Sequence, residues 1–176
     1  MISRYQRGVT VAELLVVVLV VGAFVLALSP FVRKARERAY RTECANNLRH
    51  ISVALHKYAL DHNDSFPAVS SMSELASVLT DPNTMYAEDL SIFVCPSTGH
   101  KKAMPDKSGK FKNIGYMYVS GLKATSSPSM PVCADRVAGS ALSERDNHGR
   151  HGINVLYVNG DVKWVAAVPG GKWIKD

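Results

Sequence analysis

The stretch Leu14 to Leu28, LLVVVLVVGAFVLAL, decides how this chain of 176 residues is built. It contains no charged residue, and a largely apolar sequence continues on both sides from Val9 to Val32. As a helix, residues 9–32 would extend roughly 35 Å, enough to cross a hydrocarbon layer about 30 Å thick. Residues 9–32 are therefore predicted to form a transmembrane helix.

A cleaved secretory signal peptide is the main alternative for this segment. Arg4 and Arg7 provide a basic start, and Ala27-Leu28-Ser29 has the small residues of a cleavage site. Two residues argue against it, because Pro30 would directly follow the cut and Glu13 places a charge where the apolar region begins. An ionised carboxylate near lipid is costly unless it is paired. Glu13 is therefore expected to have a partner.

The net charge of +6 and the pI of about 9.3 come largely from a basic run that follows the apolar segment. This run contains Arg33, Lys34, Arg36, Arg38 and Arg41. It would permit contact with anionic lipid or nucleic acid, but it reads more simply as a solvated helix face, so no nucleic acid is required as a partner. By position alone it opposes a cytoplasmic N-terminus, although Glu37 and Glu43 offset part of its charge.

The motif Gly8-Val9-Thr10-Val11-Ala12-Glu13, followed by the apolar run, resembles the processing site of type IV pilins and type II secretion pseudopilins. The resemblance implies cleavage between Gly8 and Val9 by a prepilin peptidase and N-methylation of Val9, although valine stands here in place of the usual phenylalanine. It also implies that Glu13 offsets the terminal amine of a neighbouring subunit during assembly. Pro30 stands where many pilins carry a helix-kinking proline.

The resemblance implies three parts: a prepilin leader (1–8), a transmembrane and assembly helix (9–32), and an extracytoplasmic pilin-like domain (33–176). The expected function is a structural subunit of a type IV pilus-like filament or a type II secretion pseudopilus. The expected location is the bacterial inner membrane, single-pass with a cytoplasmic N-terminus, and then the filament. Expected partners are copies of the chain, other pilins, prepilin peptidase, an inner-membrane assembly platform and the lipid bilayer. The alternative is a secreted or membrane-anchored binding module with an ordinary signal or anchor helix.

Beyond the apolar segment, one apolar stripe continues the helical pattern. It consists of residues spaced three and four apart, which are Cys44, Leu48, Ile51, Leu55 and Tyr58. One helix from Val9 to about His62 would be roughly 80 Å long. Its second half is expected to lay this stripe against the domain.

The C-terminal half is predicted to form a small antiparallel sheet. Residues 155–158 and 162–165 flank Asn159-Gly160, which predicts a hairpin with a type I′ turn. Further strands are expected at 114–120 and 130–134, and a short helix at 73–79, with an exposed loop around 97–112. The predicted fold class is α+β and pilin-like, with the long N-terminal helix packed on this sheet.

A second resemblance, to major pseudopilin G-like proteins of planctomycetes and verrucomicrobia, rests on separate pieces of the chain. These are the region from Cys44 to Tyr58, then Phe66-Pro67, Cys95-Pro96-Ser97, and the ending from Arg150 to Val162. In that group the histidine of the terminal motif is usually further from an Asp-Gly pair. Here 7 residues separate His151 from Asn159-Gly160.

Cys44, Cys95 and Cys133 are too few for a disulfide scaffold and lack the paired spacing of a zinc site. One disulfide and one free thiol are possible outside the cytoplasm, and the sequence leaves all three pairings open. Acidic residues and histidines of the C-terminal half show no catalytic spacing, so no enzymatic activity, cofactor or metal is expected. Weak candidates for a calcium site are Asp135, Asp146 and Asp161.

Overall fold

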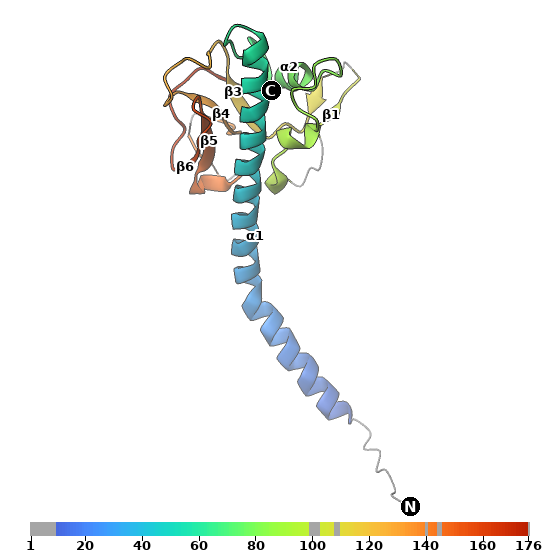
Figure 1. Ribbon diagram of the computed structural model, residues 1–176. Helices are drawn as coiled ribbons and strands as arrows, with labels where there is room; N and C mark the ends of the chain where they lie inside the picture. Colours follow the sequence, from blue (N-terminus) through green and yellow to red (C-terminus); the bar gives the residue numbers. More distant parts are fainter. Residues whose placement is uncertain (1–9, 99–102, 108–109, 140, 144–145, 176) are drawn as a thin grey trace, which may run out of the picture. The chain divides into compact units, whose positions relative to one another are not determined.

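The computed structural model describes residues 10–98, 103–107, 110–139, 141–143 and 146–175 (Figure 1). The chain divides into two compact units, with the boundary between Arg36 and Glu37. A single helix, α1 (Val11–Asp61), begins in the first unit and ends in the second. The prediction of one long helix is confirmed, apart from Val9, which lies outside the described residues.

In the second unit, one face of α1 forms part of the hydrophobic core. Cys44, Leu48, Ile51 and Leu55 are at most 1% exposed, whereas Val53 on the opposite face is 55% exposed. Tyr58 is partly buried and packs against the same core. The predicted stripe is therefore confirmed as the side of the helix that the domain covers.

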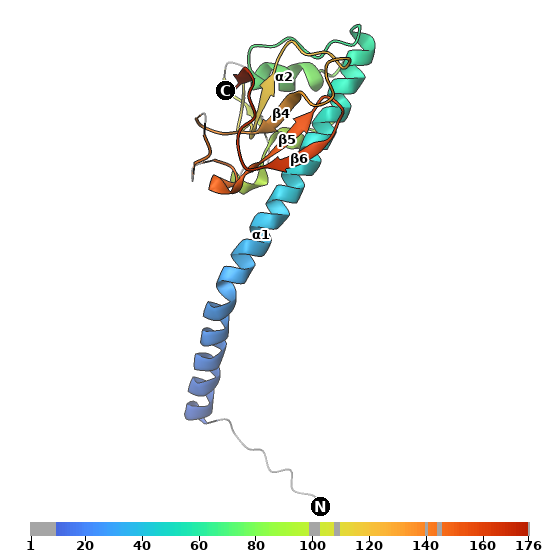
Figure 2. The same cartoon turned by 90° about the vertical axis from the view of Figure 1, so that its left-hand side faces the viewer.

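A five-stranded antiparallel sheet packs beside this part of α1 (Figures 1 and 2). Its order is β6-β5-β4-β3-β7. The strands are β3 (Tyr116–Val119), β4 (Pro131–Asp135), β5 (Ile153–Tyr157), β6 (Val162–Val165) and β7 (Trp173–Ile174). The strands expected from the sequence at 114–120, 130–134, 155–158 and 162–165 are thus confirmed, and the two-residue edge strand β7 was not foreseen.

Both faces of the sheet are covered. Tyr116, Tyr118 and Leu156 join the core that contains α1. Met117 and Val155, on the other face, belong to a second cluster against which Trp173 and other C-terminal side chains pack. The period-two alternation of the strands accounts for this division. The chain is α+β, as predicted.

The connection between α1 and the sheet holds the shorter elements. Helix α2 (Met72–Leu79) begins where Ser71 accepts a hydrogen bond from the Glu74 backbone and Glu74 accepts one from the Ser70 backbone at 2.8 Å. The 3-10 helices η1 (Leu90–Phe93) and η2 (Pro96–Thr98) follow, then the strand pair β1 (Met104–Pro105) and β2 (Phe111–Lys112). This pair lies in the segment that was expected to be a loop.

The hairpin between β5 and β6 is confirmed, but its predicted turn type is wrong. A type I′ turn needs positive φ at both central residues, and only Gly160, with φ +85°, has it, while Asn159 does not. The Gly160 backbone donates to the Tyr157 carbonyl and the Tyr157 backbone donates to the Asp161 carbonyl, both at 2.9 Å. This is a three-residue loop that ends in a left-handed glycine. The segment just before β4 favours this turn, because the Met130 carbonyl accepts a hydrogen bond from the Val158 backbone at 3.0 Å.

Candidate functional site: assembly segment and buried polar cluster

The assembly segment, defined here as residues 10–32, begins with a reciprocal cap at Thr10 and Glu13. The Thr10 backbone and hydroxyl each donate to Glu13 Oε2 at 2.9 Å, and the Glu13 backbone donates to Thr10 Oγ1 at 3.3 Å. This is a capping box. The Thr-x-x-Glu spacing was readable in the sequence, so Glu13 has a local role in starting the helix that its proposed pairing did not include.

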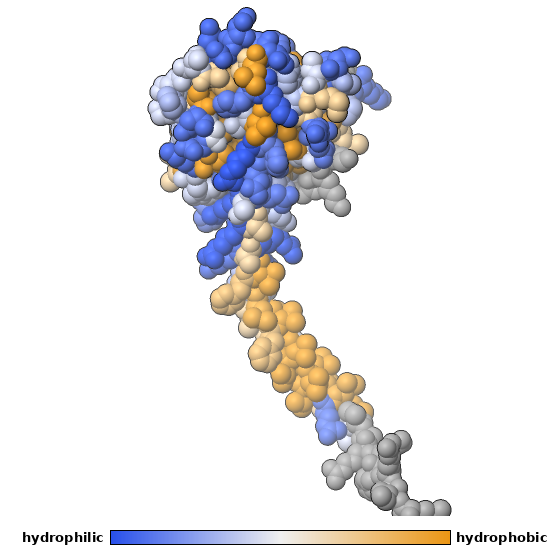
Figure 3. All heavy atoms as spheres, in the orientation of Figure 1, coloured by the Kyte–Doolittle hydropathy of each residue, from blue (hydrophilic) through white to orange (hydrophobic). Residues whose placement is uncertain are grey.

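Apolar side chains of the assembly segment are uncovered in the single chain. Val11, Leu19, Leu26 and Phe31 are 70–76% exposed. Figure 3 shows apolar side chains gathered along this part of the helix on the side in view. The helix is long and apolar enough to cross a membrane, which suggests a membrane anchor or a signal. Exposed apolar surface of this extent requires lipid or partner chains.

Helix α1 continues through Pro30, and the structure shows how the proline is accommodated. Proline has no backbone N–H, so the Leu26 carbonyl loses its usual helical donor. The Ser29 hydroxyl donates to that carbonyl instead, at 3.0 Å. Compensation by a Ser or Thr hydroxyl is one of the ways in which membrane helices tolerate proline. The kink itself stays a prediction, and Gly8 and Val9 of the expected cleavage site lie outside the described residues.

The second unit contains a buried polar cluster, defined here as Glu37, Cys44, Cys95, Asp135 and His148. Cys44 comes from α1, Cys95 from the link between η1 and η2, and Asp135 from the end of β4. His148 precedes the 3-10 helix η3 (Gly149–His151). The Sγ atoms of Cys44 and Cys95 lie 2.7 Å apart, and both residues are fully buried.

His148 is oriented by carboxylates on both ring nitrogens. Its Nδ1 lies 3.0 Å from Glu37 Oε1, and its Nε2 lies 3.4 Å from Asp135 Oδ2 and 3.7 Å from Cys95 Sγ. Arg41 holds the same Glu37 oxygen at 3.0 Å. The cluster therefore carries a cation flanked by acids whenever His148 is protonated.

Asp135 is the most deeply buried acid of the cluster. Its Oδ2 accepts hydrogen bonds from the Asn154 backbone at 2.7 Å and side chain at 3.0 Å, while its buried Oδ1 has no hydrogen-bond partner among the residues that the structure describes. Burial raises the pKa of Asp135 to about 7, and the charge of His148 opposes this shift. For His148, burial alone would lower the pKa, but the contacts with Cys95, Asp135 and Glu37 outweigh it and raise the pKa.

The two neighbouring thiols are shifted in opposite directions. The hydrogen bond from Cys44 is the main cause that lowers the pKa of Cys95 to about 5, with His148 adding to it. The pKa of Cys44 is raised, first by that same hydrogen bond and then by burial. Cys133 lies apart on β4, where burial raises the pKa of its thiol.

The buried carboxyl of Asp135 predicts a pH-dependent stability. Because its pKa is raised on folding, the folded chain binds more protons than the unfolded chain between about pH 4 and 7, and this stabilisation is lost as pH rises. Relative to Asp135→Asn, wild type is expected to lose about 2 kcal/mol of unfolding free energy from pH 5 to 8. Urea unfolding of the full chain in detergent, followed by tryptophan fluorescence, measures this. A difference that stays constant with pH would contradict the prediction.

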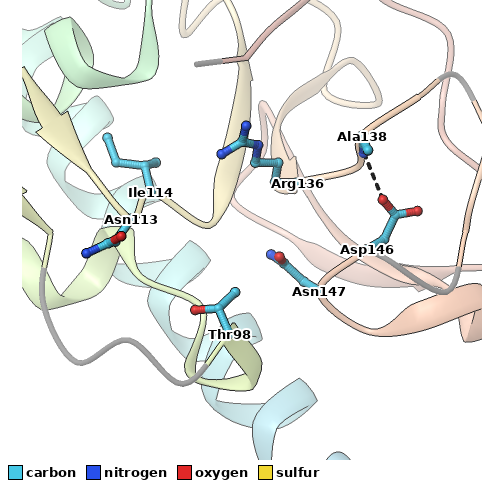
Figure 4. A pocket seen from close by; sticks show the side chains of 7 residues that line it. All are labelled: Thr98, Asn113, Ile114, Arg136, Ala138, Asp146 and Asn147. Atoms are coloured by element: carbon cyan, nitrogen blue, oxygen red, sulfur yellow. Dashed lines mark hydrogen bonds between the residues drawn. The ribbon is translucent and has the colours of Figure 1, made fainter.

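The three calcium candidates do not converge in the described part of the chain. Asp135 belongs to the polar cluster, and Asp161 accepts from Asn159 Nδ2 at 2.7 Å in the hairpin turn. Asp146 lines a pocket of about 350 Å³ with Asn113 and Arg136 (Figure 4). Its two oxygens accept from the Ala138 and Ser143 backbones, at 2.7 and 2.6 Å. Both Asp146 oxygens thus already accept hydrogen bonds, and a calcium site stays a prediction.

Among the residues described, one group of three acid, thiol or imidazole ligands meets the spacing for a metal ion: Cys44, Cys95 and His148. Sequence spacing could not have found it, because its members come from three distant elements. Cys44 and Cys95, for example, are 51 positions apart. In the sequence, His148 is one of several acids and histidines of the C-terminal half that show no catalytic spacing.

The fold places the chain in a known class. A long N-terminal apolar helix followed by a small antiparallel sheet of five strands is the pilin-like α+β architecture. Residues 33–81 match the family described as a protein of unknown function (DUF1559), which is typical of planctomycete pilin-like proteins. The matched span runs from the second part of α1 to the residues after α2. No curated protein and no solved structure matches the chain.

Proposed function

We propose that this chain is a structural subunit of a type IV pilus-like filament or a type II secretion pseudopilus. The observation that carries the proposal is the assembly segment, whose apolar side chains are exposed on a helix that also bears Glu13. In a precursor, lipid would cover this surface. In a filament, the helices of neighbouring subunits would cover the same surface. Assembly would then need no apolar surface besides this one.

Glu13 is the specific part of this proposal. A carboxylate that enters an apolar helix bundle must be paired or it destabilises the assembly. Cleavage between Gly8 and Val9 creates a positive amine close to the start of α1, and the amine of an adjacent subunit supplies the required partner. Methylation of Val9 belongs to the same maturation. A head-to-tail contact of this kind repeats without closing, which builds a fibre.

The proposal includes the location and the partners of the chain. Residues 1–8 are a leader on the cytoplasmic side, residues 9–32 cross the inner membrane, and residues 33–176 lie outside it. Prepilin peptidase, an inner-membrane assembly platform and other pilins complete the set of partners. The domain acts as a structural unit and not as an enzyme.

The experiment that tests this function is the N-terminal sequence and intact mass of the chain isolated from membranes, in cells with and without prepilin peptidase. We expect a start at Val9 carrying one additional methyl group when the peptidase is present, and the full precursor when it is absent. A start at Pro30 in both strains would show that the apolar run is an ordinary signal peptide. An uncut chain in both strains would instead indicate a simple membrane anchor, and either result would overturn the filament proposal.

A further inference from the structure

We propose that Cys44 and Cys95 form a disulfide that ties α1 to the chain between η1 and η2, and that Cys133 remains a free thiol. The inference rests on the proposed function in one respect, which is the placement of the domain outside the cytoplasm, where disulfides persist. It also selects one of the three pairings that the sequence leaves open.

The separation of the sulfur atoms favours a covalent link over two free thiols. At 2.7 Å, Cys44 Sγ and Cys95 Sγ are closer than the roughly 3.5 to 4.0 Å at which even the smaller non-bonded carbon atoms rest, and about 0.7 Å further apart than the roughly 2.05 Å of a disulfide bond. The segments that carry the two cysteines are also joined by a hydrogen bond beside the sulfurs. Cys44 lies on the buried face of α1, and Asn47 on the same helix donates to the carbonyl of Val94, the residue before Cys95, at 3.1 Å. In the described residues, no sulfur contact joins Cys133 to either of them.

A metal ion is the competing explanation, because Cys44, Cys95 and His148 have ligand atoms within 4.8 Å of one another. Two thiolates on a tetrahedral zinc ion, each about 2.3 Å from the metal, would lie about 3.8 Å apart. The observed separation is about 1 Å shorter than that. The geometry therefore favours a bond between the sulfurs over a shared metal.

The charges around the two sulfurs also favour the disulfide. In the reduced chain, a buried Cys95 thiolate would lie near the carboxyl groups of Asp135 and Glu37, and the two cations in contact with this cluster, His148 and Arg41, would balance only two of the three acidic groups. Burying excess negative charge is unfavourable. Oxidation removes the thiolate and leaves His148 between its two carboxylates.

The oxidation is balanced by thiol–disulfide exchange with an oxidised dithiol oxidoreductase. The Cys95 thiolate attacks the disulfide of that protein, which forms a mixed disulfide and releases one of its thiolates. The Cys44 thiolate then attacks Cys95 Sγ and expels the second thiolate. The chain loses two protons and two electrons, and the oxidoreductase gains the electrons as two thiols. Because both cysteines are fully buried, the exchange takes place before the domain closes.

The disulfide would close the chain between residues 44 and 95, a loop that contains α2 and η1. Such a link restricts the unfolded chain and so favours the folded one. We expect reduction under denaturing conditions to lower the ratio of folded to unfolded protein by about 100-fold on refolding. Reductant added to the folded chain is expected to act slowly, since it must wait for the domain to open.

The test uses full-length chain from membranes, denatured in excess N-ethylmaleimide so that buried free thiols are alkylated as they become exposed, then digested without reductant and analysed by mass spectrometry. We expect a cross-linked peptide pair that contains Cys44 and Cys95, and N-ethylmaleimide on Cys133. A Cys133→Ala control keeps the pair, whereas Cys95→Ser loses it and leaves Cys44 alkylated.

Three results would overturn the inference: alkylation of all three cysteines, a pair that contains Cys133, or one equivalent of zinc with reduced Cys44 and Cys95 in metal analysis of the unalkylated chain. The same digests report the N-terminus. A chain that starts at Val9 with three free thiols removes the disulfide and leaves the filament proposal intact. A disulfide-bonded chain that starts at Pro30 supports the disulfide and removes the filament proposal.

Discussion

Glu13→Gln is expected to abolish filament assembly while membrane insertion and the amount of subunit stay unchanged. Glutamine keeps the capping box, because its amide oxygen can still accept from Thr10, but it carries no charge to offset a neighbouring amine. Leaving that amine unpaired within apolar surroundings costs about 3 to 5 kcal/mol at each subunit contact. We therefore expect the amount of sheared filaments, measured by immunoblotting and electron microscopy, to fall by roughly 100-fold or more.

Thr10→Ala is the matched control for this substitution. It removes the hydroxyl that donates to Glu13 Oε2 and accepts from the Glu13 backbone, yet it keeps the carboxylate. A lost cap costs only about 1 kcal/mol, so assembly should stay near wild type. If Glu13→Gln assembles normally, or if Thr10→Ala fails as severely, the role of Glu13 is to begin the helix and not to pair with a neighbour.

Gly115→Ala is expected to destabilise the domain by about 3 kcal/mol or more, or to prevent its folding. A Cβ atom at this position would lie 2.5 Å from the Cys95 backbone nitrogen and 2.6 Å from Cys95 Cβ. The segments around Gly115 and Cys95 cannot easily move apart, because backbone hydrogen bonds hold them. The Gly115 backbone donates to the Phe93 carbonyl, and the Gly115 carbonyl accepts from the Arg136 backbone, both at 2.9 Å. Urea unfolding of the full chain in detergent measures the loss.

Gly170→Ala provides the comparison, since a Cβ atom there would meet no heavy atom within 4 Å. Its unfolding free energy should stay within about 0.5 kcal/mol of wild type. Equal effects of the two substitutions would mean that alanine at Gly115 is accommodated by a shift of the chain around Cys95. The close approach would then not limit folding.

Elements with strong local patterns could be predicted from the sequence. The apolar run and the stripe from Cys44 to Leu55 indicated the long helix, because every turn repeats the same pattern. The hairpin around Asn159-Gly160 was equally readable. Its turn type was not, since the loop bonds through Val158 to Met130, and contacts with a distant segment override a local preference.

The buried polar cluster shows where sequence reasoning stops. Cys44, Cys95, Asp135 and His148 come from a helix, a link, a strand end and a loop, and no spacing along the chain reflects their proximity. The sequence could supply the inventory of thiols, but only the packing of the sheet beside α1 brings two of them together. The capping role of Glu13 differs, because Thr10-x-x-Glu13 was a local signal that the membrane interpretation obscured.

The two edge strands of the sheet affect whether copies of the domain can pair with one another. Exposed strand edges can pair with the edge of another molecule. Here the outer strands are short, four residues in β6 and two in β7. The exposed Lys163 lies on β6, and Lys172 precedes β7. Like charges and short edges disfavour pairing between the sheets of two copies of the domain, so in the filament proposed above the apolar helices would be left as the main contact between subunits.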